Sequence, residues 1–314
     1  MTIVEPLNIS ITTAPCCWGV DDPKNPYLPP WLRVLKEASL AGYKGLELGP
    51  YGYLPLDVPL ISNVLNQYDL FIIAGTIFSD LVSVSNRQSL LFQTDNICHL
   101  LSQLPQPNRY SNQHYPTPYL TIMDWGHDVR DYAAGHSDRA PRLSPDEWKE
   151  MTETITLIAK HAFDIYGIRT VIHPHAGGYI EFSDEIEQIV QDIDSQIAGL
   201  CIDTGHTYYA GMDPVKTLLH YQDRIDYIHF KDINISVFND VMQEKIRFFD
   251  ACAKGVMCPI GKGILDYPSI YTTLKQIKYE GFITIEQERD PRHADGSLQD
   301  VKASRAFLNK MGFI

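Results

Sequence analysis

The chain has 314 residues, of which 44% are hydrophobic and 21% charged, and its formal net charge at pH 7 is −13. These values are typical of a globular protein, and no apolar run approaches the roughly 20 residues that span a bilayer. The acidic balance opposes nucleic-acid binding, which needs a positive surface that displaces counterions. The N-terminus lacks the basic and apolar regions of a signal peptide. We therefore expect a cytoplasmic protein with neither a nucleic-acid nor a membrane partner.

The six cysteines show neither a CxxC pair nor the spacing of a disulfide-rich scaffold. We interpret them as buried or incidental thiols, which fits a reducing compartment. The sequence leaves open whether the protein forms a homo-oligomer.

Short segments rich in β-branched residues alternate with amphipathic stretches along the chain. The predicted strands are 9–13, 45–48, 70–75, 119–124, 170–175, 199–203, 226–231 and 282–286. The predicted helices between them include 31–41, 87–101, 145–166, 184–193, 214–220 and 267–278. This order indicates βα units around a parallel sheet, and eight units predict an α/β fold of one (β/α)₈ barrel domain over residues 1–314.

One helix start is marked clearly by Ser144-Pro145-Asp146-Glu147, which combines a serine cap, a proline in the first turn and a glutamate three residues after the cap. Residues 124–143 are therefore expected to form a loop. The stretch 234–263, which follows the seventh predicted strand, is irregular. It is interpreted either as a lid or pocket wall at the substrate-binding end of the barrel or as a structural insertion.

Ionisable side chains gather where the predicted strands end, at the barrel rim that carries active-site loops. Alternate residues of a strand share a face, so His173 pairs with His175, His229 with Lys231, and Glu286 with Glu288. The predicted deeper layer consists of His173, Asp203, His229 and Glu286. The predicted outer layer consists of His175, Lys231 and Glu288.

Two imidazoles and two carboxylates around one point favour Mn, Co, Fe or Zn over calcium. Burying Asp203 and Glu286 together without a cation would be costly, because two adjacent carboxylates do not both stay ionised in a low-dielectric site. Alone, His229 would be a hydrogen-bonded structural histidine and Glu286 an ion-pair partner. Their conjunction at separate strand ends predicts one divalent metal ion.

Three further residues each have two interpretations. Glu47 either holds substrate or pairs with a lysine or arginine. Lys231 either polarises a carbonyl or holds Glu286 and Glu288 by its charge. Trp18 either forms a pocket wall against a sugar ring or packs in the core.

At these motifs the sequence resembles the xylose isomerase-like superfamily of sugar isomerases and epimerases, over nearly the whole chain. Within it, the similarity is to the inosose (2-keto-myo-inositol) dehydratase group. The shared motifs are Trp18-Gly19-Val20, the segment 41–55, His173-Pro174-His175-Ala176-Gly177-Gly178, Asp203-Thr204-Gly205-His206, His229-Phe230-Lys231-Asp232 and Pro259-Ile260-Gly261-Lys262-Gly263.

The resemblance implies a metal bound at the ends of strands five to eight, with Asp203, His229 and Glu286 as ligands. Many relatives place a glutamate where this chain has His173, so His173 and Glu181 compete as the fourth ligand. The strand periodicity favours His173, and Glu181 is then assigned to substrate binding. Endonuclease IV has a related fold, but its basic DNA-binding face is at odds with this acidic composition.

The chemistry expected of such a site is enolisation of a small polyhydroxy carbonyl compound. Glu286 or Glu288 is predicted to be the base, with His175, His206 and Lys231 orienting oxygens or donating a proton. The motifs favour dehydration of a keto-inositol or keto-sugar. An isomerase or epimerase acting on a sugar or sugar phosphate is the alternative enzyme, and a non-catalytic sugar-binding barrel is the alternative outside enzymes.

Overall fold

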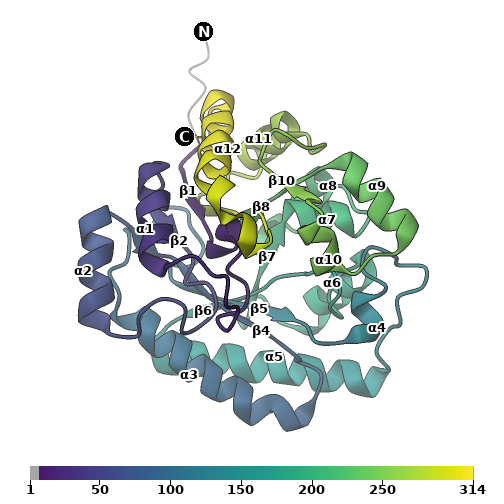
Figure 1. The fold of residues 1–314 in the computed structure, drawn as a ribbon. Helices are drawn as coiled ribbons and strands as arrows, with labels where there is room; N and C mark the ends of the chain where they lie inside the picture. Colours follow the sequence, from purple (N-terminus) through teal and green to yellow (C-terminus); the bar gives the residue numbers. More distant parts are fainter. Residues whose placement is uncertain (1–6, 314) are drawn as a thin grey trace.

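The barrel sheet closes through an interrupted strand. The computed structural model describes residues 7–313, and within them the main sheet has nine parallel strands in the order β3-β2-β1-β11-β8-β7-β6-β5-β4. Only Ile73 separates β3 (Phe71–Ile72) from β4 (Ala74–Ser79), so the two ends of this order meet in one strand. For the described residues, the predicted eight-stranded barrel is therefore confirmed (Figure 1).

The predicted strands and helices are present, with ends shifted by a few residues. The other barrel strands are β1 (Ile9–Thr13), β2 (Gly45–Leu46), β5 (Tyr119–Asp124), β6 (Arg169–Ile172), β7 (Gly199–Asp203), β8 (Ile225–Phe230) and β11 (Gly281–Ile285). The longer outer helices are α1 (Trp31–Leu40), α2 (Val58–Tyr68), α3 (Arg87–Gln103), α5 (Pro145–Tyr166), α6 (Ser183–Asp192), α8 (Pro214–His220), α11 (Tyr267–Gln276) and α12 (Ser297–Met311).

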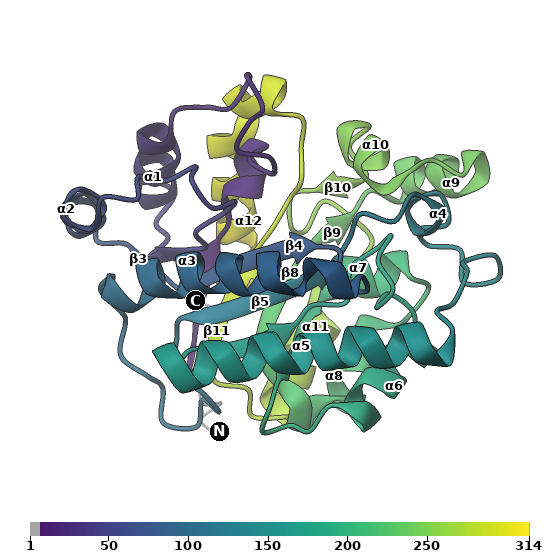
Figure 2. The same cartoon turned by 90° about the horizontal axis from the view of Figure 1, so that it is seen from below.

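Helix α5 begins and ends as its sequence predicts. The Glu147 carboxylate accepts the Ser144 backbone N–H at 2.8 Å, and Gly167 ends the helix in a left-handed conformation. The helix lies beside α3 on the outside of the barrel (Figure 2), where Arg87 and Glu150 form an ion pair at 2.6 Å. The preceding loop, predicted over 124–143, includes the single turn α4 (Asp128–Asp131).

The inward and outward faces of the strands alternate, and this alternation positions the site. On β7, Leu200 and Ile202 pack between the sheet and the helices, whereas Cys201 belongs to the cluster inside the barrel. Continuing along the inward face leads from Cys201 to Asp203, and on β8 from Tyr227 to His229. Asp203 and His229 therefore lie at the rim, and Cys201 and Tyr227 fill the inward positions below them.

The stretch 234–263 is more regular than the sequence suggested. It contains α9 (Ile235–Glu244), α10 (Phe248–Ala253) and β10 (Met257–Cys258), which pairs antiparallel with β9 (Asp232–Ile233). The Asp232 carboxylate accepts backbone N–H groups of Gly261 and Gly263 at 2.8 and 3.0 Å, which closes the segment against the barrel. In Figure 2, α10 and the loop that follows β1 rise above the same end of the barrel.

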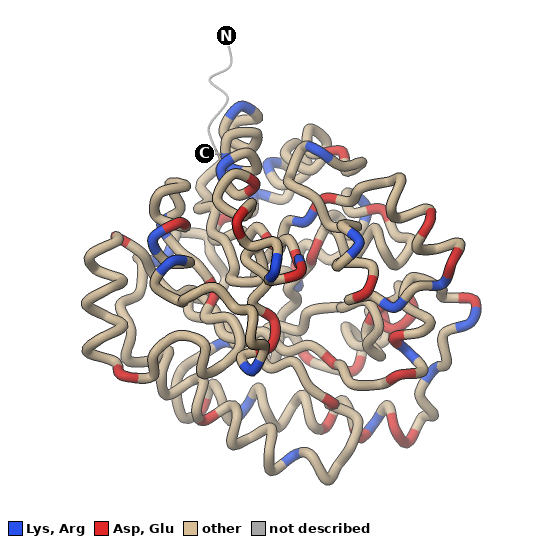
Figure 3. Tube along the Cα trace, viewed as in Figure 1, with Lys and Arg blue, Asp and Glu red and all other residues tan. Residues whose placement is uncertain are grey.

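The outer surface carries charges of both signs. Figure 3 shows acidic and basic residues interspersed along the helices of the described chain. Among the helices of residues 7–313, none combines the length and apolar character needed to cross a bilayer.

Candidate active site

Four side chains from separate segments converge at the C-terminal end of the barrel. His173, Asp203, His229 and Glu286 each offer a ligand atom, and these atoms all lie within 4.8 Å of one another. The Nδ1 atom of His229 lies 3.0 Å from Oε2 of Glu286 and 3.9 Å from Oδ2 of Asp203. Nε2 of His173 lies 3.7 Å from the same Asp203 oxygen. The structure thus brings together the four residues of the predicted deeper layer.

Glu47 orients the ring of His229 by a hydrogen bond. The Nε2–H group of His229 donates to Oε1 of Glu47 at 2.8 Å, and the Tyr227 hydroxyl donates to the same oxygen at 2.7 Å. Because an ionised carboxylate only accepts, the proton of a neutral His229 lies on Nε2 and the Nδ1 lone pair faces Asp203 and Glu286. Glu47 therefore pairs with a histidine, where the sequence suggested a lysine or arginine as one alternative.

The donor set fits a divalent metal ion. Both ring nitrogens of His173 and Nδ1 of His229 are buried without a hydrogen-bond partner. Such atoms are rare in native proteins, because an unpaired buried polar group costs about 1–3 kcal/mol. Two imidazole nitrogens facing the oxygens of Asp203 and Glu286 form a mixed set that suits a first-row transition metal.

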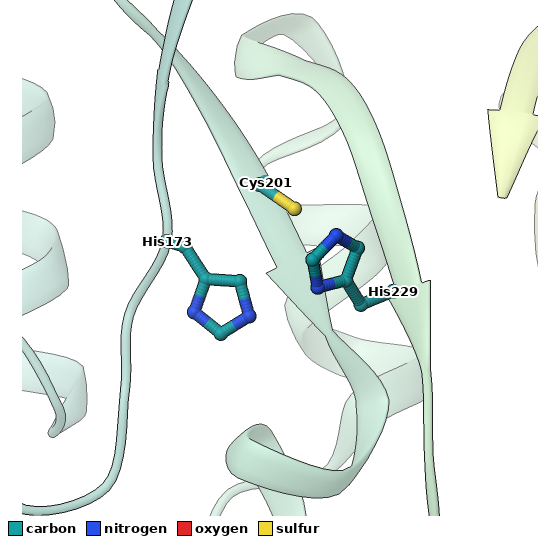
Figure 4. A group of neighbouring side chains, drawn as sticks. All are labelled: His173, Cys201 and His229. Atoms are coloured by element: carbon teal, nitrogen blue, oxygen red, sulfur yellow. The ribbon is translucent and has the colours of Figure 1, made fainter. Parts of the chain in front are cut away.

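A cysteine that the sequence interpretation treated as incidental lies directly beside this group. Figure 4 shows the Cys201 thiol next to the facing rings of His173 and His229. Burial raises the pKa of Cys201 to about 12, so it is a neutral thiol at pH 7. Its position two residues before Asp203, on the same inward face, is a signal by which the sequence could have located it.

Lys231 lies among the carboxylates and has no solvent exposure. Its Nζ is 2.9 Å from Oδ2 of Asp203 and 3.0 Å from Oε1 of Glu288, and it also donates to Glu286. Although burial acts in the opposite direction, the Lys231 charge helps lower the pKa of Asp203 to about 2. The geometry favours the alternative in which Lys231 holds the carboxylates by charge. The ammonium group of Lys231 also contacts Asp203 and Glu286, which belong to the predicted deeper layer. We call Asp203, Glu286, Glu288 and Lys231 the site cluster.

A cavity of about 420 Å³ opens above this cluster. Its polar side includes Glu47, His175, Glu286 and Glu288, together with Cys16 and Asp21 from the segment after β1. Its apolar side includes Phe78, Met123 and Phe249. Phe249 belongs to α10, so the stretch 234–263 supplies part of the pocket wall. The spacing of Cys16, Asp21 and Phe78 contains no pattern that would have assigned them to the site.

Glu288 is the acid of the site cluster with an unused oxygen. Its Oε2 is buried without a hydrogen-bond partner, while its Oε1 meets Lys231. Burial raises the pKa of this carboxyl, and Lys231 only partly offsets the rise. Glu286 differs: when His229 is protonated, its charge and that of Lys231 hold the pKa of Glu286 well below the usual range despite the burial of Glu286. Of the two predicted bases, Glu288 is therefore the more basic.

His175 and His206 are stacked with their ring centres 4.1 Å apart. Burial holds the pKa of both rings well below the usual value, so both are neutral at pH 7. The Nδ1–H group of His175 donates to the Ala176 carbonyl, which leaves its Nε2 as an acceptor. Nδ1 of His206 accepts the Ala176 N–H, so its proton lies on Nε2. His175 lines the cavity, and His206 lies behind it.

Trp18 does not form a pocket wall. Its side chain is completely buried in the main hydrophobic core, and its indole N–H donates to Glu37 at 2.7 Å. The aromatic and apolar residues that do line the cavity include Phe78 of β4, Met123 of β5 and Phe249 of α10. The structure therefore agrees with the second alternative, in which Trp18 packs in the core.

Glu181 also lies away from the four converging side chains. Its two oxygens accept backbone N–H groups of Gly135 and Gly177 at 2.6 and 2.9 Å, and it lies 3.5 Å from Arg130. Arg130 in turn donates to both oxygens of Glu185 at 2.6 and 3.0 Å. Because these donors already satisfy Glu181, it neither joins the ligand group nor lines the cavity. We call Arg130, Glu181 and Glu185 the Arg130 cluster.

The fold is shared with known proteins. Residues 119–311 match the family described as Xylose isomerase-like TIM barrel. The chain belongs to this family. Both the predicted resemblance and the predicted fold are thereby confirmed.

Similar proteins are matched over almost their full lengths. The chain is 28% identical over 316 residues to inosose dehydratase of Geobacillus kaustophilus, with 98% of this chain and 96% of the relative covered. It is 27% identical over 282 residues to inosose dehydratase of Clostridium beijerinckii, with 90% of each covered. Among solved structures, the zinc-bound IOLI protein superposes with a TM-score of 0.68 at 12% identity, covering 96% of this chain and 98% of that one.

Proposed function

We propose that this protein is a metal-dependent lyase that dehydrates a keto-inositol or a related keto-sugar by way of enolisation. The observation that carries the proposal is the convergence of His173, Asp203, His229 and Glu286 below an open cavity. Relatives that match along nearly their whole length are named inosose dehydratase, and the chain is an enzyme of the sugar isomerase, epimerase and dehydratase type.

In this proposal the four converging residues hold one divalent ion, with Mn, Co, Fe and Zn as candidates. A bound ion of this kind supplies a Lewis acid that polarises a carbonyl oxygen. Glu47 fixes the His229 tautomer, as its 2.8 Å contact with Nε2 supports. Lys231 keeps Asp203 and Glu286 ionised and balances their charge.

The proton transfer is assigned to groups that line the cavity. Oε2 of Glu288, buried and without a partner, removes the proton from the carbon beside the carbonyl. His175 presents its Nε2 to the cavity as an acceptor for a substrate hydroxyl, with its ring orientation held by Ala176 and His206. The hydroxyl on the next carbon then leaves as water, taking up the proton that Glu288 removed, and the product is a conjugated ketone. Phe78 and Phe249 exclude water from the other side.

The test is incubation of the Mn²⁺-loaded protein with 2-keto-myo-inositol in D₂O. We expect deuterium to enter the position beside the carbonyl and the absorbance of a conjugated ketone to grow. Exchange without the new absorbance would favour an isomerase or epimerase. The absence of both signals, from protein that binds metal stoichiometrically, would contradict the proposal.

A further inference from the structure

A second cavity adjoins the one above the site cluster. It has a volume of about 600 Å³, and its lining shares Asp21, Phe249 and Glu288 with the first cavity. We call the cavity above the site cluster the inner chamber and the second cavity the outer chamber. Because three side chains face both spaces, a group bound at Glu288 in the inner chamber has the outer chamber directly beside it.

The outer chamber is lined by helix α10 and by two loops that pack closely together. One is the segment after β1, which includes Asp22 and Tyr27, and the other follows β11 and includes Arg289 and Arg292. Gly19 joins them: a Cβ there would lie 2.5 Å from the Pro291 backbone, and its φ of +77° favours glycine. The two walls are thus in direct contact at Gly19, which indicates a preformed chamber.

The lining of the outer chamber suits an uncharged polar ring. Tyr27 has 62% of its surface exposed, and Arg292 lies 5.9 Å from its ring centre. An exposed aromatic face surrounded by donors and acceptors is able to stack on the apolar face of a sugar while the edges bind hydroxyls.

An anion fits the outer chamber less well. Arg292 is paired with Asp290, and Arg289 donates to Asp300 at 2.6 Å, so both guanidinium groups already have carboxylate partners. The lining acids Asp21, Asp22, Glu288 and Asp290 outnumber the lining cations Lys24, Arg289 and Arg292. The inner chamber has no lysine or arginine among its described lining residues.

We infer that the natural substrate is an uncharged keto-sugar that carries a second ring, with the keto ring in the inner chamber and the second ring against Tyr27. This inference rests on the proposed function for the chemistry, and it adds the substrate class. Contacts with the second ring are remote from the reacting carbon, and such contacts raise kcat/KM.

The test compares 3-keto-glucose with 3-keto-cellobiose and 3-keto-maltose, which differ from it by a β-linked or α-linked second ring. We expect at least one of the disaccharides to undergo deuterium exchange with a kcat/KM about tenfold above that of the single ring. Tyr27→Ala should bring that ratio close to one. Phe92→Ala removes an aromatic side chain that is 67% exposed on α3, outside both chambers, and should leave the ratio as in the wild type.

Calorimetric titration with glucose, cellobiose and maltose separates this inference from the proposed function, because binding requires no chemistry. Tighter binding of a disaccharide than of glucose, lost in Tyr27→Ala, supports the outer chamber even if no ketone exchanges deuterium. Exchange of 3-keto-glucose with no preference for either disaccharide would overturn the inference and leave the proposed function intact. Equal affinities for all three sugars would likewise overturn it.

Discussion

The barrel rim contains two buried groups of acids around a cation, the Arg130 cluster and the site cluster. They differ in which of their atoms have no hydrogen-bond partner. In the Arg130 cluster, both oxygens of Glu181 and both of Glu185 accept donors from arginine or the backbone. In the site cluster, Oε2 of Glu288 has no partner, and neither do the neighbouring nitrogens of His173. Burial and charge are common to both clusters. In the Arg130 cluster the unpaired buried atom is Nε of Arg130, away from the cavity, whereas in the site cluster it is an oxygen of Glu288, which lines the cavity.

This difference separates a structural ion pair from a candidate reaction centre. A buried charge is expensive unless it is paired, so the Arg130 cluster, whose carboxyl oxygens all have donors, is explained by the loops that it joins. Unpaired buried atoms have no such explanation within the chain, which makes them the better guide to a ligand. Four variants test this contrast, and their expected effects decrease from Arg130 to Glu181.

The largest effect is expected when the Arg130 cluster loses its cation. Arg130→Met leaves the Glu185 carboxylate buried without its guanidinium partner, and should lower the free energy of unfolding by about 3–5 kcal/mol. Urea unfolding measures this loss. The control Arg139→Met, on the exposed surface, should stay within about 0.5 kcal/mol. A loss below about 1 kcal/mol in Arg130→Met would mean that the cluster does not stabilise the rim.

In the site cluster, Glu286→Gln should affect chemistry more than folding. It replaces a candidate ligand and a partner of Lys231, and we expect the rate of deuterium exchange into 2-keto-myo-inositol to fall by about 10²–10³-fold. The exposed Glu244→Gln serves as the matched control and should keep the wild-type rate. An unchanged exchange rate in Glu286→Gln would remove this carboxylate from the centre.

A smaller effect is expected at Glu47, which touches the candidate centre only through His229. Glu47→Gln keeps the size of the side chain but removes the charge that accepts the Nε2–H group. Metal affinity should fall about 10–100-fold, as is usual when such a partner is lost. Calorimetric titration of the metal-free protein with Mn²⁺ measures it. Affinity equal to that of the wild type would show that Glu47 does not position the ligand.

The smallest effect at mildly acidic pH is expected at Glu181. Burial raises its pKa from 4.5 to about 8, although the N–H groups of Gly135 and Gly177 oppose the rise. Between pH 5 and 8 the folded protein therefore binds a proton that the unfolded chain has released, and this contribution to stability declines as the pH rises. Glu181→Gln turns an amide NH₂ towards one of these two N–H groups, which loses its acceptor, so the variant should cost about 1 kcal/mol at pH 5.5. The variant should also lose less of its free energy of unfolding than the wild type between pH 5.5 and pH 8.5.

Urea unfolding at pH 5.5, 7.0 and 8.5 follows both proteins across this range. Parallel declines in the wild type and in Glu181→Gln would assign the pH dependence to other groups.

The sequence was sufficient for the parts of the molecule that depend on local periodicity. The barrel follows from the repeated βα pattern, and the start of α5 follows from Ser144 and Glu147, because these interactions join residues close together in the chain. The same period-two rule placed Asp203, His229 and Glu286 on inward faces at the strand ends. For such residues, the strand itself determines on which face the side chain lies and how far along the barrel axis it is placed.

Tertiary structure decided which partner each polar atom meets. Trp18 and Glu181 are close in sequence to pocket-like motifs, yet they turn to Glu37 and to the backbone of Gly135 and Gly177. Phe78 of β4 and Phe249 of α10 form walls of the same cavity although they are far apart in the sequence, and no local spacing encodes their contacts. Periodicity specifies a direction relative to one strand, whereas a partner depends on where several other segments lie in space.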